Sequence, residues 1–158
     1  MLRNPIETEK SLLIDLAYST GVWQDGEADA LLGAVLDQYY ARELEPEHRV
    51  VVLPDANDKI VGWSYYAPSF HAPGVWDVWW IGVHATEHGR GYGRQLLLAI
   101  EADIKAKQGR VVVIETSSTE PLAKARRFYP KLGYKMRGDI PEFYGPGDAK
   151  VIFSKNLE

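Results

Sequence analysis

Hydrophobic positions divide the chain into segments with helical spacing and segments with strand-like runs. Four segments place apolar residues three or four positions apart, which is the spacing of an amphipathic helix. These predicted helices are residues 7–19, 27–42, 94–107 and 122–132. Six shorter segments are rich in β-branched or aromatic residues, which favours strands. These predicted strands are residues 49–53, 59–67, 75–83, 110–115, 134–137 and 149–154.

The order of these elements predicts a mixed α/β or α+β domain with a central sheet and helices packed on it. In the strand at 75–83, alternation places Trp76, Val78 and Trp80 on one face and Asp77, Trp79, Ile81 and Val83 on the other. Because both faces are largely apolar, this strand is predicted to be central. The last two strands are predicted to be short and to flank a loop around Gly145–Gly147.

Length and charge narrow the class of protein. A chain of 158 residues is expected to form a single domain over residues 1–158 with its own core. The net charge of −4 argues against general nucleic-acid binding, which usually needs a basic face. The absence of cysteine excludes a thiol nucleophile and a thiolate metal site, and no metal is expected. No segment has a signal peptide's apolar core or the length of a membrane span, so we expect a cytoplasmic protein without a membrane partner.

The most informative segment lies between the strand at 75–83 and the helix at 94–107. Its three glycines alternate with other residues, and its members are His88, Gly89, Arg90, Gly91, Tyr92, Gly93 and Arg94. Glycines allow a backbone to approach a ligand closely, and the following helix adds unpaired N–H groups and a positive dipole end. This arrangement suits a phosphate or pyrophosphate, and the two arginines add positive charge.

The loop alone leaves several interpretations open. A nicotinamide-binding unit would place the glycines near the first strand of the chain, whereas here they lie in mid-chain. Such a unit also needs an acidic residue at the end of the next strand, and Glu115 lies there, so spacing alone does not exclude this function. A phosphate-binding Walker loop is absent because no Gly-Lys-Ser/Thr follows the glycines. A tight strand-to-helix turn with two solvated arginines is the purely structural alternative.

Two motifs together resemble the GNAT family of N-acetyltransferases. Residues 83–97 resemble the family's motif A, a strand ending in Val followed by Gln/Arg-x-x-Gly-x-Gly/Ala and an apolar helix. Residues 125–134 resemble motif B, Ala-x-x-x-Tyr-x-x-x-Gly-Phe/Tyr, with Tyr129 as the tyrosine. The resemblance covers about residues 60–158. It implies a mostly antiparallel sheet, splayed between the strands at 75–84 and 110–116, with helices on both faces.

The resemblance also implies acetyl-CoA as co-substrate and an amine as acceptor. The pyrophosphate would lie on the backbone amides of residues 89–94, and the pantetheine arm would pair with the strand at Ile81 and Val83. Residues 75–133 would form the acetyl-CoA-binding core and residues 1–48 a variable helical region on the acceptor side. By analogy with family members, a homodimer is also expected.

The sequence departs from the family pattern at four places. His88 occupies the usual Gln/Arg position, and Leu122 stands where many members have an Asn that reaches the pantetheine arm. Pro130 follows the motif tyrosine and is expected to kink or shorten its helix. Residues 1–5 are barely long enough for the strand with which family members usually begin.

Acyl transfer to an amine needs a base, because an alkylammonium has a pKa near 10.4 and only about one in two thousand is neutral at pH 7. Asp77 is the first candidate, since it interrupts an apolar strand and falls at the register where some members carry a catalytic glutamate. Glu115 and His84 are the alternatives. By motif position, Tyr129 is expected to donate a proton to the departing thiolate, and otherwise to pack as an ordinary helix tyrosine.

The acceptor is expected to be a small-molecule amine, an amino acid or a peptide N-terminus. Its site would combine the N-terminal helices with loops at 68–74 and 139–147, which contain several aromatic residues. Two other functions stay open. One is a non-catalytic module that binds acyl-CoA and regulates a partner, and the other is a toxin-type acetyltransferase acting on aminoacyl-tRNA, which the net charge disfavours.

Overall fold

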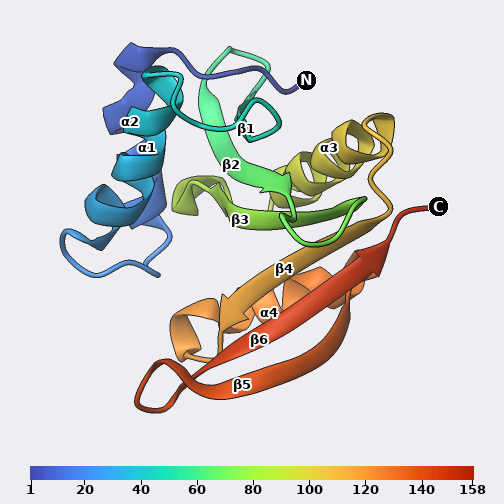
Figure 1. Cartoon of the computed structure of the whole chain (residues 1–158). Helices are drawn as coiled ribbons and strands as arrows, with labels where there is room; N and C mark the ends of the chain where they lie inside the picture. Colours follow the sequence, from blue (N-terminus) through green and yellow to red (C-terminus); the bar gives the residue numbers. More distant parts are fainter. The chain divides into compact units, whose positions relative to one another are not determined.

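The computed structural model describes all 158 residues, whose six strands form one sheet in the order β1-β2-β3-β4-β6-β5 (Figure 1). The strands are β1 (Arg49–Pro54), β2 (Ile60–Pro68), β3 (Val75–Val83), β4 (Val111–Ser117), β5 (Lys135–Gly145) and β6 (Asp148–Asn156). The pairs β1–β2, β4–β6 and β5–β6 are antiparallel, whereas β3 and β4 are parallel. The prediction of a mixed, mostly antiparallel sheet is confirmed.

Each predicted helix is present, and three of them begin with a short irregular turn. The α-helices are α1 (Lys10–Ser19), α2 (Ala34–Tyr40), α3 (Tyr92–Ala106) and α4 (Ala123–Lys131). The short turns are η1 (Glu7–Glu9), η2 (Asp29–Gly33), η3 (Ala85–Glu87) and η4 (Glu120–Leu122). Pro130 lies within the last turn of α4, which ends at Lys131. Its ring has no N–H to donate and crowds the preceding turn, so it disfavours a longer helix. None of these helices combines the length and apolarity that a membrane crossing needs.

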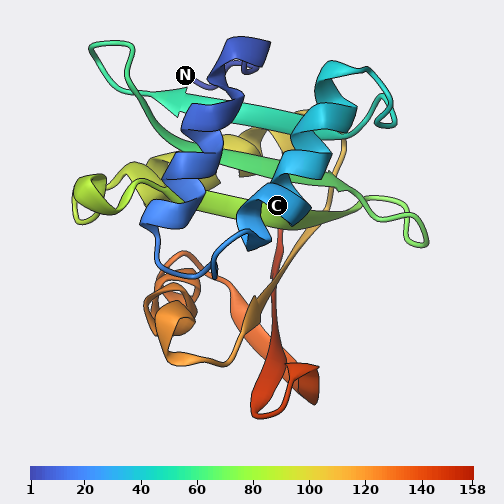
Figure 2. The same ribbon diagram turned by 90° about the vertical axis from the view of Figure 1, so that its left-hand side faces the viewer.

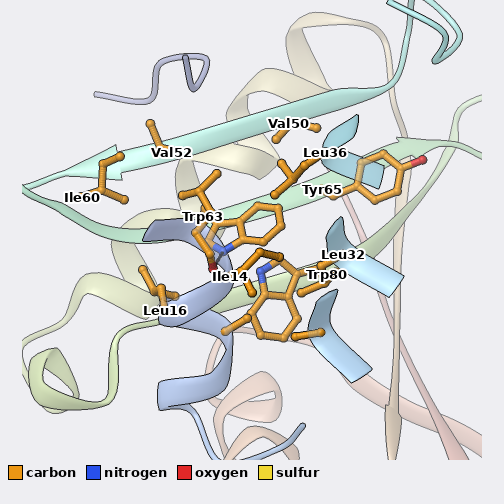
Figure 3. Packing of buried hydrophobic residues seen from close by; sticks show 13 residues of the cluster. Ile14, Leu16, Leu32, Leu36, Val50, Val52, Ile60, Trp63, Tyr65 and Trp80 are labelled. Atoms are coloured by element: carbon orange, nitrogen blue, oxygen red, sulfur yellow. Dashed lines mark hydrogen bonds between the residues drawn. The ribbon is translucent and has the colours of Figure 1, made fainter. Parts of the chain in front are cut away.

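The chain forms two compact units. Unit one contains residues 1–66 and 80–100, and unit two contains residues 67–79 and 101–158. In unit one, α1 and α2 cover one face of β1 and β2 (Figures 1 and 2). Their apolar sides meet in a cluster that includes Leu13, Leu16, Leu36, Val50, Val52, Trp63 and Trp80 (Figure 3). The indole N–H of Trp63 donates to the Leu13 carbonyl oxygen at 2.9 Å, so this large side chain is buried without an unpaired donor.

The first half of α3 packs against the opposite face of β2. Leu96, Leu97 and Ile100 are fully buried along one side of the helix, as its sequence spacing predicts. At Gly62 of β2, a β-carbon would lie 3.2 Å from Leu96 Cδ2 and 3.0 Å from the Gly82 carbonyl oxygen. Because Gly62 has no side chain, α3 packs closely against β2. This packing sets the position of the N-terminus of α3, next to the glycine-rich loop.

The N-terminal segment makes a single β-bridge with β1. The Arg3 amide donates to the Val52 carbonyl oxygen at 3.1 Å, and the Val52 amide donates to the Arg3 carbonyl oxygen at 2.8 Å. The segment before residue 7 is thus reduced to one paired residue where family members usually have a first strand.

In unit two, α4 covers one face of β4 and β6. The Tyr129 ring lies 5.6 Å from the Phe153 ring of β6 and 6.0 Å from the Tyr134 ring, centroid to centroid. Phe153 pairs with Ile114 of β4, and both are buried on this face. The contacts hold α4 on the sheet through aromatic packing.

One prediction in unit two is wrong. The closing strands are long, and residues 139–145, predicted as loop, belong to β5. Pro141 lies within β5, which is possible because β5 is the last strand of the sheet and its outer edge needs no ladder donor. The prediction that β3 is a central strand is confirmed, although its face with Asp77 and Trp79 is not buried, since Trp79 is 61% exposed.

Candidate active site

The glycine-rich loop has an open, left-handed backbone. Gly89 and Gly91 have φ angles of +80° and +82°, a region that residues with a β-carbon rarely adopt. A β-carbon built on either glycine would meet nothing within 4 Å. The space beside the loop is therefore available to a ligand, and glycine is required by the backbone rather than by crowding.

The amides of this loop have no partner within the protein. No hydrogen bond is donated by the backbone N–H groups of residues 89–94, and the first paired amide is that of Gln95, which donates to the Gly91 carbonyl oxygen at 3.0 Å. These groups open the fifteen-residue helix α3, so its positive dipole end adds to their attraction for an anion. The loop has the donor set that a pyrophosphate needs.

Beneath the loop, a buried carboxylate holds one of its arginines. Glu87 is 7% exposed and lies 3.1 Å from Arg90 Nη1 and 3.1 Å from Lys59 Nζ. The expected contribution of Arg90 as free positive charge is therefore corrected, because a buried carboxylate neutralises part of it. The sequence reasoning missed Glu87, whose burial comes from the turn η3 and not from any apolar pattern.

Two histidines stabilise the entry to the loop. His88 Nε2 lies 2.8 Å from the carbonyl oxygen of Val83, so this nitrogen carries a proton and donates to the end of β3. His84 Nδ1 accepts from the Thr86 amide at 3.2 Å and caps the turn η3. This use of the ring favours the structural interpretation of His84 over its role as a base.

The edge of β3 that faces β4 is paired over a short stretch. The ladder joins Val75–Val78 to Val111–Ile114 and ends there, whereas β3 continues to Val83.

In unit two, the structure places the two candidate carboxylates on one face of the sheet. Asp77 of β3 pairs in register with Val113 of β4, and Glu115 lies two positions further along β4. Asp77 is partly buried, and burial together with the nearby charge of Glu115 raises the pKa of its carboxyl. Glu115 is paired with Lys150 of β6, with 2.6 Å between Oε2 and Nζ. The sequence reasoning missed Lys150, because the pairing depends on the β4–β6 register.

Tyr129 lies on the opposite face of the same strands. It is 6% exposed, and burial raises the pKa of its hydroxyl, so the group is a proton donor and not a phenolate at neutral pH. Its neighbour Tyr134 has a hydroxyl that is fully buried without a partner. The structure thus brings Asp77 and Glu115 together but separates both from Tyr129 by the thickness of the sheet.

Comparison with known proteins gives the chain its family. A sequence model described as the acetyltransferase (GNAT) family matches residues 12–134. A solved structure from Desulfovibrio desulfuricans, assigned to the GNAT family of acetyltransferases, is 26% identical and superposes with a TM-score of 0.90 over 100% of this chain and 99% of its own. A search of curated proteins found no match to this chain.

More distant structures share the fold. An aminoglycoside 6'-N-acetyltransferase in complex with coenzyme A is 17% identical, with a TM-score of 0.73 over 99% of this chain and 96% of its own. A ribosomal-protein-alanine N-acetyltransferase from Brucella melitensis is 16% identical, with a TM-score of 0.76 over 99% of each chain. Since the family model spans most of the sequence and includes the glycine-rich loop, the chain belongs to the GNAT family of acetyltransferases.

Proposed function

We propose that the protein transfers the acetyl group of acetyl-CoA to a primary amine by direct attack within a ternary complex. One observation carries this proposal: the row of unpaired amides at residues 89–94, on a backbone that two left-handed glycines keep open. In a chain of this family, such a row fits the pyrophosphate of coenzyme A. Residues 75–133 would then form the acetyl-CoA-binding core.

The protein's own groups account for the rest of the docking. His88 holds the loop to the end of β3 through the Val83 carbonyl oxygen. The backbone of β3 around Ile81 and Val83 would pair with the amides of a pantetheine arm. The main chain supplies most of the contacts, so binding tolerates side-chain changes such as His88 and Leu122 better than changes at the glycines.

The reaction moves two protons. Asp77, directly or through a water, takes a proton from the acceptor's ammonium, and the freed nitrogen forms a bond to the thioester carbonyl carbon. The carbon–sulfur bond then breaks, and the thiolate takes a proton from the Tyr129 hydroxyl. The second proton of the attacking nitrogen is lost as the amide forms and restores that hydroxyl through solvent. The raised pKa of Asp77 supports its role, because a carboxylate is a better base when its conjugate acid is weaker.

The attacking amine and the departing sulfur lie on different sides of the tetrahedral carbon, so the proton acceptor and the proton donor serve it from different directions. Asp77 lies on one face of the β3–β4 ladder and Tyr129 lies on the other, against Phe153.

The acceptor in this proposal is a small amine, an amino acid or a peptide N-terminus, approached from the helical region of residues 1–48. The names of the structural neighbours support the class and no single member of it, since one acts on an aminoglycoside and another on a ribosomal-protein alanine. We include a homodimer in the proposal, and sedimentation of the purified protein tests it.

Calorimetry with CoA and acetyl-CoA tests the cofactor, and thiol release across a panel of amines tests the transfer. We expect micromolar binding and acceptor-dependent release of the thiol. Tight binding with no release across a broad panel would support the alternative, a non-catalytic acyl-CoA-binding module. No heat with either compound, on protein whose fold is verified by circular dichroism, would overturn the proposal.

A further inference from the structure

Four side chains form a diagonal row across the strands of unit two. Asp77 of β3 pairs in register with Val113, Glu115 of β4 with Ile152, and Lys150 of β6 with Ser117. Glu115 follows Val113 by two residues on β4, and Lys150 precedes Ile152 by two residues on β6. Because side chains alternate between faces, Asp77, Glu115 and Lys150 therefore lie on the same face of the sheet. Phe143 of β5 completes the row beside Lys150.

Lys150 is fixed between two partners. Its Nζ lies 2.6 Å from Glu115 Oε2 and 4.2 Å from the centre of the Phe143 ring. The side chain is 16% exposed, which is low for a lysine. A carboxylate on one side and an aromatic face on the other hold the ammonium in one place, so the pair is more ordered than a solvated surface ion pair.

Glu115 lies between Asp77 and Lys150 in this row. If Glu115 were free, it would compete with Asp77 as a base. With the ammonium in contact, one oxygen of Glu115 is engaged, and removing that contact costs a charge-assisted hydrogen bond. Asp77 has no such partner.

We propose that Lys150 is a positioning residue of acetyl transfer, which engages Glu115 and so leaves Asp77 as the base. This rests on the proposed function. Lys150 acts through Glu115 and touches neither substrate in this scheme. Its second effect is electrostatic, because its positive charge offsets the negative charge of Glu115 at Asp77.

The charged and titratable groups around Asp77 come from three strands. Glu115 of β4 raises the pKa of Asp77 and Lys150 of β6 lowers it, both after the larger effect of burial. Tyr144 of β5 and Asp148 of β6 lie further along the row, where Asp148 accepts a hydrogen bond from the Ser117 hydroxyl at 2.5 Å. The Lys150→Met change therefore removes the positive charge nearest to the pair of carboxylates.

The direct test is an NMR titration of the Asp77 carboxyl carbon in the full chain without any substrate. Lys150→Met is expected to raise the pKa of Asp77, Glu115→Gln to lower it, and Lys150→Arg to leave it close to that of the wild type. This measurement needs no bound acetyl-CoA, so it stands even if the proposed activity fails. An Asp77 titration that is the same in the wild type and in Lys150→Met would overturn the inference.

Kinetics give the second test once an acceptor is known. Lys150→Met is expected to shift the acid limb of the kcat/KM profile to higher pH and to change kcat/KM little on the alkaline side, because Asp77 then keeps its proton to a higher pH. Glu115→Gln is expected to retain most of the turnover that Asp77→Asn loses. A loss in Glu115→Gln as large as that in Asp77→Asn would show that Glu115 is the base and the inference is wrong.

Lys155→Met is the matched control. Lys155 is also on β6 and also pairs with a carboxylate, that of Glu101, but it lies on the other face near the Tyr134 ring. Its removal is expected to lower the melting temperature without moving the Asp77 titration or the pH profile. If Lys155→Met moved both as Lys150→Met does, the effect would be general charge and the inference would fail.

Discussion

The imidazole of His88 lies 2.8 Å from the carbonyl oxygen of Val83, through Nε2. This bond closes the glycine-rich loop onto the end of β3, across five residues of chain. It also uses a carbonyl at the strand edge where a pantetheine arm would pair. His88 occupies a position where the family usually has Gln or Arg. Its ring orders the loop by a hydrogen bond within the protein and not by a contact with the ligand.

His88→Ala is expected to weaken acetyl-CoA binding about fivefold, because one hydrogen bond of roughly 1 kcal/mol no longer orders the loop. His88→Gln keeps an N–H donor and is expected to lose less. Calorimetry with CoA on the two variants checks this. Equal affinity in His88→Ala and the wild type would show that the loop is ordered without the histidine.

Gly91→Ala is expected to weaken CoA binding by at least tenfold and to cost about 1–2 kcal/mol of stability, because its φ of +82° is strained for alanine and the new methyl group faces the ligand. Gly21→Ala provides the control. Gly21 has a φ of +76° and, like Gly91, open space around a β-carbon, but it lies in the turn after α1. It is expected to lose similar stability in a denaturant titration and to keep its CoA affinity. Equal affinities in the two variants would contradict a ligand at the loop.

Tyr129→Phe is expected to lower kcat about 100-fold, the scale of general acid catalysis, while the Kd for CoA stays unchanged. The paired control is Tyr134→Phe, which removes a buried hydroxyl that has no partner in the same aromatic cluster. That change is expected to leave kcat unaltered and to keep or slightly raise stability. Full turnover in Tyr129→Phe would remove the hydroxyl from the reaction.

Local sequence signals predicted the elements that carry the glycine-rich loop. The strand at 75–83 has the predicted bounds, and α3 begins two residues earlier than predicted, because in both segments hydrophobic spacing and glycines agree. The glycines of the loop also have the positive φ angles that their residue type favours, at Gly89 and Gly91. In β5 the local signals conflict, since Pro141 and nearby polar residues indicate a loop while pairing with β6 makes a strand.

The charge pattern of the site was not predictable from sequence. Glu87 under Arg90, and Lys150 beside Glu115, are brought together by a turn and by strand register over separations of 3 and 35 residues. Neither pairing has a periodic signature. Composition gives only the net charge. The pKa of Asp77 depends on where the nearby charges of Glu115 and Lys150 lie, which the sequence does not show.

Asp77→Asn is expected to stabilise the fold at neutral pH while it lowers activity. The folded state raises the pKa of Asp77 above its usual value near 3.8, chiefly by burial. The native state therefore binds a proton more tightly than the unfolded chain, so this residue's contribution is fully present below the unfolded pKa and is lost as pH rises through the folded one. At pH 7 the ionised carboxylate is a cost, and the neutral amide removes it. Denaturant midpoints are expected to be higher for Asp77→Asn at pH 7 and to converge with the wild type at pH 3.

The control for this prediction is Asp25→Asn, because Asp25 is exposed. Asp55→Asn is a poor control, since the Asp55 carboxylate accepts hydrogen bonds from the amides of Asn57 and Lys59. A lower midpoint for Asp77→Asn at pH 7, with Asp25→Asn unchanged, would mean that the ionised carboxylate stabilises β3 and is not held there for the reaction.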